Sequence, residues 1–340
     1  MNFKISVIAL FCTLASTPVL SAVNDESNIF RDMVLEDSIL TIPGDTGRAI
    51  NTTVNQGGRL WLTGTGNSAV PTKFAENTVV NNGGFMFLIT RTVGASGIII
   101  NEGGRLYAAA TSELSDIVMN GGTAEFFSPD SIRNLTIGDG ASATFGWDNI
   151  TAIRKISGLK ILKGGFFGLT GYNVNGKDSN FEDASVGGVM DITYAGYVNF
   201  KSLHMDDGEI IINHSPPYHT VVNIGDLSGT GSFAMNTSLA DRTADFIHIQ
   251  HGTGRFGLIV NDSGRDITDH EDLTLNLVNE VSGDASFELV GSSGKRSPAV
   301  DGGTYMYTLH RGKDKDGLSG TVWYLGVMTD EPDNGGGDGG

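Results

Sequence analysis

The chain has 340 residues, of which 48 are glycine, 8 are proline and one is cysteine, and its formal net charge is −17 at pH 7. A surface this acidic argues against nucleic acid and against anionic lipid as partners. The length allows the chain to bury a large core. A single cysteine excludes a framework of internal disulfides.

Residues 1–22 have the composition of a secretory signal peptide. Lys4 provides the positively charged N-terminal region, an apolar stretch follows at residues 5–14, and residues 20–22 (Leu-Ser-Ala) provide a cleavage site. The apolar stretch is too short to span a bilayer. Cys12 lies inside this segment, so the exported chain is expected to contain no cysteine. The sequence therefore predicts export to the periplasm, and to the cell surface or the medium if a translocator is supplied.

A short phrase recurs from residue 51 onwards: two or three β-formers, Asn or a neighbour, Gly-Gly, and another β-rich run. Looser copies lie at residues 138–140, 164–165, 187–188 and 207–208. In the four clear copies, which lie 26, 20 and 18 residues apart, the second glycines are Gly58, Gly84, Gly104 and Gly122. A period near twenty residues is typical of a stack of similar structural units.

Each unit has the composition of short strands joined by turns. Alternating β-branched and aromatic residues favour half-buried strands, and Asn-Gly-Gly supplies the positive φ that turns the chain. About twenty residues accommodate two or three short strands, which is one turn of a parallel β-solenoid with strands about 4.8 Å apart. Because parallel crossovers are almost always right-handed, we expect an all-β, right-handed parallel β-helix. An antiparallel sandwich or propeller is the alternative, since Asn-Gly also makes hairpins.

The last third of the chain is richer in large aromatic residues. A solenoid has to cover its open end, because an exposed strand edge invites pairing with other chains. We therefore expect the segment from residue 226 onwards to cap the coil and to govern its folding. The alternating runs of this segment contain Phe233, Phe256, Phe287, Tyr305, Tyr307 and Trp323.

The order of these phrases resembles the passenger domains of pertactin-like and AIDA-like autotransporters of Gram-negative bacteria. The runs at residues 227–233 (Leu-Ser-Gly-Thr-Gly-Ser-Phe), 302–309 (Gly-Gly-Thr-Tyr-Met-Tyr-Thr-Leu) and 323–325 (Trp-Tyr-Leu) are similar to the C-terminal stability segment of that family. The Gly-Gly repeats look like its adhesin-type repeats. The resemblance implies a signal peptide at 1–22, a β-helix passenger at 23–225, a pertactin-like stability segment at 226–328 and a Gly/Asp-rich linker at 329–340.

The resemblance also implies a function. The family continues beyond its linker into an outer-membrane β-barrel, whereas this chain stops within the linker, so we expect either a truncated gene or a barrel on another chain. The family implies a non-enzymatic adhesin or self-association protein, which contacts host cells, matrix or other copies of itself through the flank of the β-helix. A polysaccharide-processing β-helix enzyme and a non-functional remnant of an autotransporter gene are the alternatives.

No residue is assigned a catalytic, metal-binding or cofactor-binding role. The nearest approach to the Gly-Asp-Ser-Gly turn of serine proteases is residues 261–264 (Asn-Asp-Ser-Gly), which lack the first glycine and form an ordinary turn sequence. Residues 291–294 (Gly-Ser-Ser-Gly) do not fit the Gly-x-Ser-x-Gly elbow. His248 and His251 are three residues apart, which in a regular strand places their side chains on opposite faces.

Two groups of acidic residues are candidates for a calcium site and for a polysaccharide-cleaving site. Residues 313–317 superficially suggest a calcium loop, but two lysines and a shortage of acidic ligands favour a solvated hairpin tip. A polysaccharide-cleaving site would need paired carboxylates about 5–9 Å apart. The candidates are Asp191, Asp206, Asp207 and Glu209. The preferred interpretation is that these four are acidic turn residues.

Overall fold

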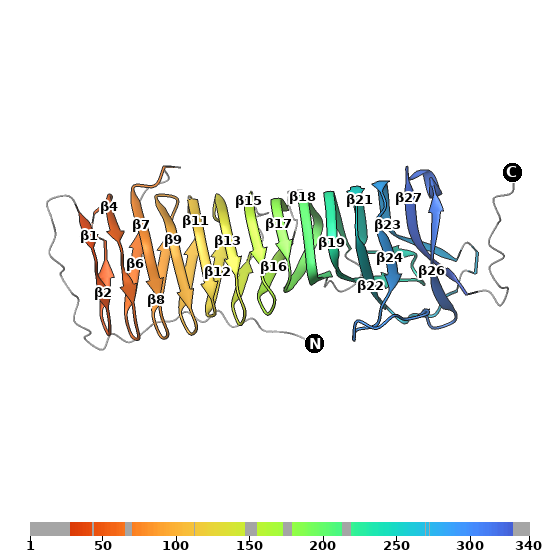
Figure 1. Cartoon of the computed structure of the whole chain (residues 1–340), viewed down its shortest axis with the longest axis horizontal. Helices are drawn as coiled ribbons and strands as arrows, with labels where there is room; N and C mark the ends of the chain where they lie inside the picture. Colours follow the sequence, from red (N-terminus) through yellow and green to blue (C-terminus); the bar gives the residue numbers. More distant parts are fainter. Residues whose placement is uncertain are drawn as a thin grey trace.

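The computed structural model describes residues 28–42, 44–64, 70–111, 113–146, 155–172, 179–212, 219–268, 270–271 and 273–328. The expected signal peptide and the expected linker lie outside these ranges. The described chain is an elongated stack of strands that climbs rung by rung from β1 to β27 (Figure 1). Among the described residues, no helix has the length and apolar character needed to cross a membrane.

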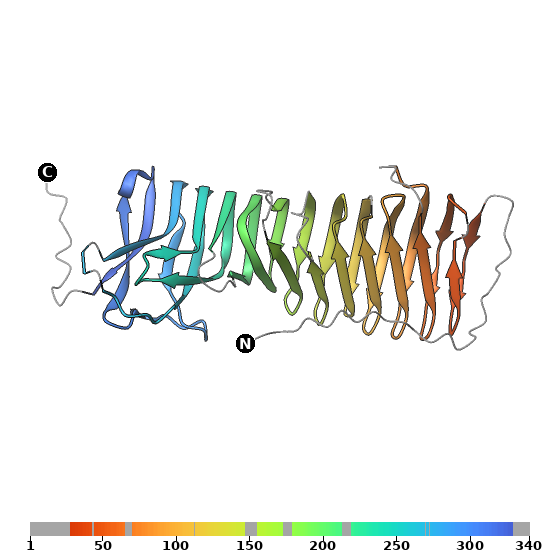
Figure 2. The ribbon, with the colours of Figure 1, turned by 180° about the vertical axis from the view of Figure 1, so that it is seen from behind.

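Most strands belong to two columns that run along the axis, which we call lane 1 and lane 2; the rear view shows the same stack from the other side (Figure 2). Lane 1 begins with β1 (Ile29–Arg31), β4 (Gly47–Ile50), β7 (Lys73–Val80), β9 (Val93–Asn101), β11 (Glu113–Asn120), β13 (Ser131–Ile137), β15 (Ile156–Ile161) and β17 (Ser179–Val186). The short strands β2 (Val34–Leu35) and β5 (Thr53–Val54) continue lane 1 beyond a bend. Lane 2 begins with β3 (Ile39–Thr41), β6 (Arg59–Thr63), β8 (Phe85–Ile89), β10 (Arg105–Ala109), β12 (Thr123–Phe127), β14 (Ser142–Phe145) and β16 (Phe166–Tyr172).

Later strands extend both lanes. β18 (Val189–Ile212) and β19 (Thr220–Ser238) each pass from one lane to the other, so they pair in parallel with strands of both. Lane 1 ends with β21 (Phe246–Gly252) and β23 (Thr274–Gly283), and lane 2 with β22 (Arg255–Asp262) and β24 (Ser286–Leu289). The remaining elements lie at the C-terminal end: β20 (Thr243–Ala244), β25 (Val300–Asp301), β26 (Met306–Lys313), the 3₁₀ turn η1 (Lys315–Gly317) and β27 (Thr321–Val327).

The strand register confirms the parallel solenoid. Arg59 pairs with Phe85, Phe85 with Arg105, and Arg105 with Thr123, which reproduces the steps of 26, 20 and 18 residues along lane 2. The pairing is parallel throughout these rungs, so the antiparallel sandwich and the propeller are excluded. Each strand repeats the position of the strand one turn earlier, as the Gly-Gly spacing predicts.

The two glycines of the repeat serve different purposes. The first one has positive φ, as at Gly57, Gly83 and Gly103, where φ is 71°, 71° and 72°. The second one lies against the preceding turn: a Cβ at Gly84 would stand 2.3 Å from the carbonyl oxygen of Val54. The repeat therefore needs glycine for backbone conformation at one position and for close approach of two rungs at the next.

Alternation along each strand fills one continuous core. In β6 the side chains of Leu60 and Leu62 are fully buried, whereas those of the residues beside them are half-buried or exposed. Rings stack inside the coil as well, with centroids 4.7 Å apart for Phe126 and Phe145 and 5.3 Å apart for Phe145 and Phe167. Large aromatic residues are therefore not confined to the C-terminal third, because the repeats also bury a stack of them.

An antiparallel hairpin covers the C-terminal end of lane 1. β27 pairs antiparallel with the last lane-1 strand, β23, and β26 pairs antiparallel with β27. Trp323 of β27 packs edge-on against Phe287 of β24 at 5.6 Å between ring centroids, and Leu325 of the same strand is fully buried. The last rung of the core is thus covered by apolar side chains rather than left open to solvent.

Candidate functional site: the outer face of the solenoid

The outer face of lane 1 between β15 and β19 carries a groove with a volume of about 450 Å³. Its outward side chains come from four successive turns, and the buried residues between them, such as Ala184 and Leu203, belong to the core. We call the outward set the polar groove; it consists of Lys160, Asp183, Ser185, Ser202, His204, Asp226 and Ser228.

The strand register arranges the polar groove in two columns along the solenoid axis. Neighbours within a column lie on adjacent strands, about 4.8 Å apart. One column consists of Asp183, Ser202 and Asp226. The other consists of Lys160, Ser185, His204 and Ser228. Because the backbone of every rung is fixed by ladder hydrogen bonds, these side chains project from rigid positions.

Two hydrogen bonds order the polar groove. Ser202 Oγ donates to Oδ1 of Asp183 at 3.0 Å, and His204 Nδ1 lies 3.0 Å from Ser228 Oγ. Asp226 is exposed, and within the described part of the chain its carboxylate makes no hydrogen bond and no ion pair. The groove therefore presents one carboxylate with its full accepting capacity, beside hydroxyls and an imidazole.

The contact between His204 and Ser228 resembles the first half of a hydrolytic serine site. Such a site also needs a group that orients the imidazole from its second nitrogen. Ser228 is the one hydrogen-bond partner of the His204 ring among the described residues. Among the described residues, the pair therefore lacks the orienting group of such a site.

A stripe of rings follows the outer face of lane 2 over four turns. Ring centroids are 5.6 Å apart for Trp61 and Phe87, 5.0 Å for Phe87 and Tyr107, and 4.9 Å for Tyr107 and Phe127. Burial, aided by the Glu125 carboxylate, raises the pKa of the Tyr107 hydroxyl above its ordinary value. The rings are half-buried and cover one another, so the stripe mainly stabilises successive turns.

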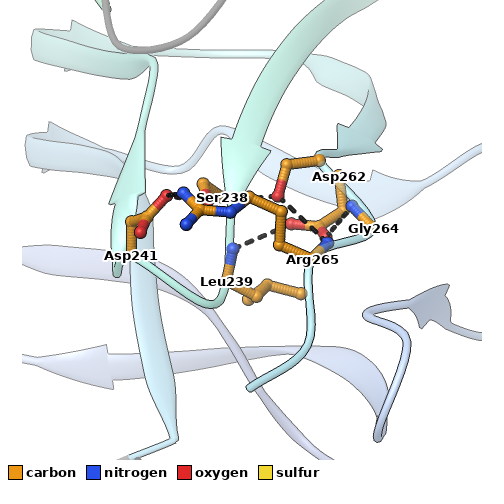
Figure 3. Close-up of polar contacts among 7 residues, drawn as sticks. Ser238, Leu239, Asp241, Asp262, Gly264 and Arg265 are labelled. Atoms are coloured by element: carbon orange, nitrogen blue, oxygen red, sulfur yellow. Dashed lines mark hydrogen bonds and ion pairs between the residues drawn. The ribbon is translucent and has the colours of Figure 1, made fainter. Parts of the chain in front are cut away.

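The Asn-Asp-Ser-Gly sequence at residues 261–264 lies at the end of β22, where it holds two loops together (Figure 3). The Asp262 carboxylate accepts hydrogen bonds from Leu239 N, Thr237 Oγ1 and Gly264 N at 2.8, 3.0 and 2.8 Å. A carboxylate that accepts two bonds from the preceding turn and one from its own loop acts as a structural clamp.

Ser263 takes part in the same clamp. Its Oγ donates to Ser238 Oγ at 3.1 Å, and Ser238 Oγ donates to Asp241 Oδ2 at 2.7 Å. Arg265 Nη1 reaches the same Asp241 oxygen at 2.5 Å, as Figure 3 shows. Within the described residues no histidine is hydrogen-bonded to Ser263, so the general base that a protease nucleophile requires is not in place there.

Two of the four acidic residues considered for polysaccharide cleavage accept a hydrogen bond from a threonine, and the other two lie on different lanes. Asp191 Oδ1 accepts a hydrogen bond from Thr193 Oγ1 at 2.8 Å, and Asp207 Oδ1 accepts one from Thr230 Oγ1 at 2.5 Å. Asp207 has φ of 56° and sits at an irregularity in the pairing of β18 with β19, as expected of a turn residue. Asp206 is exposed on lane 1 and Glu209 lies on lane 2.

The expectation that His248 and His251 point to opposite faces is wrong. His248 pairs with Asn223 and His251 with Asp226, while Gln250 lies at the bend between them, so both side chains point outwards on two facets of the coil. Regular alternation is lost where the chain turns a corner. Among the described residues, no group of three or more His, Cys, Asp or Glu side chains is arranged to hold a metal ion.

Residues 313–317 lie at the tip of the β26–β27 hairpin. Lys315 Nζ contacts Oδ2 of Asp316 at 2.5 Å and lies 4.8 Å from the ring centroid of Tyr324. The lysine therefore folds back onto the hairpin and pairs with the Asp316 carboxylate. Residues 291–294 form a turn closed by a hydrogen bond from Gly294 N to Gly291 O at 2.8 Å.

Sequence reasoning missed the polar groove. Its members on neighbouring strands are separated by 19 to 25 residues along the chain, so they form no local motif. The signal that could reveal them is a pattern of Asp-x-Ser, Ser-x-His and Asp-x-Ser at residues 183–185, 202–204 and 226–228, each with an apolar residue at its centre. Recognising this pattern requires the register of the solenoid.

Comparisons with known proteins find similarity to autotransporters. A family model described as Pertactin matches residues 200–326. The autotransporter adhesin/invasin TibA of Escherichia coli O78:H11 (strain H10407 / ETEC) is 26% identical over 272 residues, which cover 75% of this chain and 24% of TibA. The autotransporter CRAC of Citrobacter rodentium (strain ICC168) is 29% identical over 172 residues, 48% of this chain and 10% of CRAC.

The chain thus spans about a quarter of the length of TibA and a tenth of that of CRAC. The crystal structure of the Haemophilus influenzae Hap adhesin aligns with 89% of this chain and 33% of its own chain, at 15% identity and a TM-score of 0.38. The parallel solenoid and these matches support one class of protein, the autotransporter passenger domains. Its residues 200–326 form a pertactin-type segment.

Proposed function

We propose that the chain acts as an adhesin or self-association passenger without enzymatic activity. Its partners would be host cells, extracellular matrix or other copies of the chain. TibA, with which three quarters of the chain aligns, is named an adhesin/invasin, and this supports the proposal. The observation that carries it is the repetitive outer face, on which each turn presents side chains at the same positions as the turn before.

A repeated outer face suits adhesion. Amide ladders illustrate the repetition: Asn81 Nδ2 donates to Asn55 Oδ1 at 2.9 Å, and Asn101 Nδ2 donates to Asn81 Oδ1 at 2.8 Å. A partner that binds one turn weakly can bind several turns at once, and the affinity then rises through effective concentration. Such binding needs no deep catalytic pocket.

The proposal assigns a role to each segment of the chain and a cellular location to the protein. Residues 1–22 would direct export, residues 23–225 would form the display part of the passenger, and residues 226–328 would stabilise it, with a linker at 329–340. The chain would be exported to the periplasm and displayed on the cell surface or secreted when a translocator is supplied. Protease added to intact cells distinguishes these locations.

The test of function uses the purified full chain. We expect it to adhere to cultured cells, to matrix proteins or to itself, and to produce no turnover with panels of protease and glycosidase substrates. Absence of all three kinds of adhesion would contradict the adhesin proposal. Reproducible cleavage of a polysaccharide that is lost in the Asp206→Asn or Glu209→Gln variant would support the enzymatic alternative instead.

A further inference from the structure

We propose that the polar groove binds an uncharged sugar, and that Asp226, Ser202 and His204 are its main contacts. This inference rests on the proposed adhesin function and names the ligand class of one site. No residue of the groove was singled out by the sequence.

The first argument is shape. Along one column a serine lies between two carboxylates, so Ser202 forms a low point between Asp183 and Asp226. His204, two residues along β18, rises beside the same serine. The two carboxylate-bearing residues are two strand spacings apart, or about 10 Å, which leaves room for one sugar ring above Ser202.

The second argument is hydrogen-bonding capacity. A sugar presents several hydroxyls, each of which both donates and accepts. Carboxylate oxygens accept strongly from hydroxyls, and an imidazole nitrogen or a serine hydroxyl can donate in return. Asp226 meets this need best, because its carboxylate is exposed and has no partner within the described residues. Asp183 is already held in place by Ser202 Oγ.

The third argument is charge. Ser202 has a carboxylate on each side, whereas Lys160, the lysine of the groove, lies two rungs away, so on a chain of net charge −17 the site repels sialylated and sulfated sugars. Among the described residues, the two carboxylates also belong to no group of three or more His, Cys, Asp or Glu side chains that could hold a metal ion. An uncharged polyol is the ligand class that uses these hydrogen-bond acceptors without charge repulsion and without a metal ion.

The experiment measures binding of the purified full chain to immobilised oligosaccharides. The neutral set contains galactose, glucose and N-acetylhexosamine units, taken from both animal glycans and bacterial polysaccharides, and the acidic set contains sialylated and sulfated forms. We expect binding to neutral sugars and none to acidic ones. The two origins within the neutral set decide whether the ligand belongs to a host or to another bacterium.

Two variants locate the site. Asp226→Ala removes an exposed carboxylate, and we expect binding to weaken about tenfold or more, because a hydrogen bond to a charged group is lost. Ser202→Leu fills the low point and should abolish binding. Glu102→Ala is the matched control, since Glu102 is an exposed carboxylate in the turn after β9, far from the groove. Unchanged thermal unfolding midpoints show that the variants fold.

The outcomes separate this inference from the proposed function. A chain that adheres to cells or to itself but binds no neutral sugar overturns the inference and leaves the adhesin proposal standing. Sugar binding that survives both Asp226→Ala and Ser202→Leu overturns the site, as does a preference for acidic sugars. Failure of all adhesion, measured in the separate cell, matrix and self-association assays, overturns the proposed function.

Discussion

At the scale of single residues, the second glycine of each Gly-Gly pair sets the distance between turns. A Cβ at Gly84 would stand 2.3 Å from the Val54 carbonyl oxygen, which belongs to a ladder and cannot move without separating two rungs. We expect Gly84→Ala to lower the free energy of unfolding by roughly 3 kcal/mol, the upper end of the usual cost of overpacking. Urea unfolding followed by circular dichroism measures the change.

Gly140→Ala is the matched control for the glycine prediction. Gly140 has φ of 70°, but a Cβ there would meet nothing within 4 Å. Only the cost of a left-handed backbone remains, which is about 1–2 kcal/mol. Gly84 itself does not have positive φ, so its cost is expected to come from contact between turns. An effect at Gly84 no larger than that at Gly140 would contradict the close-approach role of the second glycine.

Glu280 is a buried carboxyl at the last turn of lane 1. Its Oε1 accepts a hydrogen bond from Ala285 N at 2.9 Å, and its pKa is raised above the ordinary value, chiefly by burial and further by the Asp284 carboxylate. The folded state therefore holds the proton more tightly than the unfolded state. As the pH rises from about 4.5 through the raised pKa, this residue makes the folded state progressively less stable.

The Glu280→Gln variant tests whether ionisation of Glu280 lowers the stability of the folded state as the pH rises. Glutamine keeps an oxygen for Ala285 N but cannot ionise, so the variant should gain stability relative to the natural chain as the pH is raised from 4 to 7.5. Unfolding free energies at the two pH values provide the comparison, and Glu102→Gln controls for the loss of one charge. A difference between variant and natural chain that does not change with pH would contradict the raised pKa.

At the scale of elements, β27 carries the cap of the solenoid. Its Trp323 packs against Phe287 on the last rung, and β27 itself covers the edge of β23. Truncating a buried aromatic costs roughly 3–5 kcal/mol, and Trp323, which is half-buried, should fall near the lower value. Because solenoid turns stabilise their neighbours, we expect Trp323→Ala to make the whole chain sensitive to protease.

Trp61→Ala is the comparison for the cap. Trp61 is also half-buried, but it lies on the outer face of an early turn, next to Phe87. Its loss should open only nearby turns, so limited proteolysis should leave a long C-terminal fragment intact. A chain that survives Trp323→Ala and collapses with Trp61→Ala would place the stabilising end of the solenoid at the N-terminus.

The same elements show what the sequence can reveal. The Gly-Gly phrase predicted the parallel coil and its first three steps, because the turn chemistry recurs at each of these corners. The facing of His248 and His251 was not predictable, since the bend at Gln250 interrupts the alternation of β21. The polar groove was hidden for a related reason: Ser202 and Asp226 become neighbours only through a step of 24 residues, which lies beyond the four clear Gly-Gly copies.

At the scale of the whole molecule, charge opposes the proposed association of one solenoid with another. The chain is elongated and carries a net charge of −17, so two copies lying side by side repel along their length. Salt screens this repulsion: the Debye length falls from about 30 Å at 0.01 M to about 10 Å at 0.1 M ionic strength. Self-association should therefore strengthen with added salt, provided that hydrogen bonds and apolar contacts, which salt screens less, supply the attraction.

Sedimentation velocity of the purified chain across a series of sodium chloride concentrations tests this prediction. We expect the fraction of dimers and larger species to rise with salt at constant protein concentration. Glu102→Lys together with Asp139→Lys, which reverses two exposed acidic positions, should produce the same rise at lower salt, because each substitution reduces the repulsion. Association that weakens with salt would instead mean that opposite charges on the two copies attract each other, and the flank contact would then have to involve the exposed lysines and arginines.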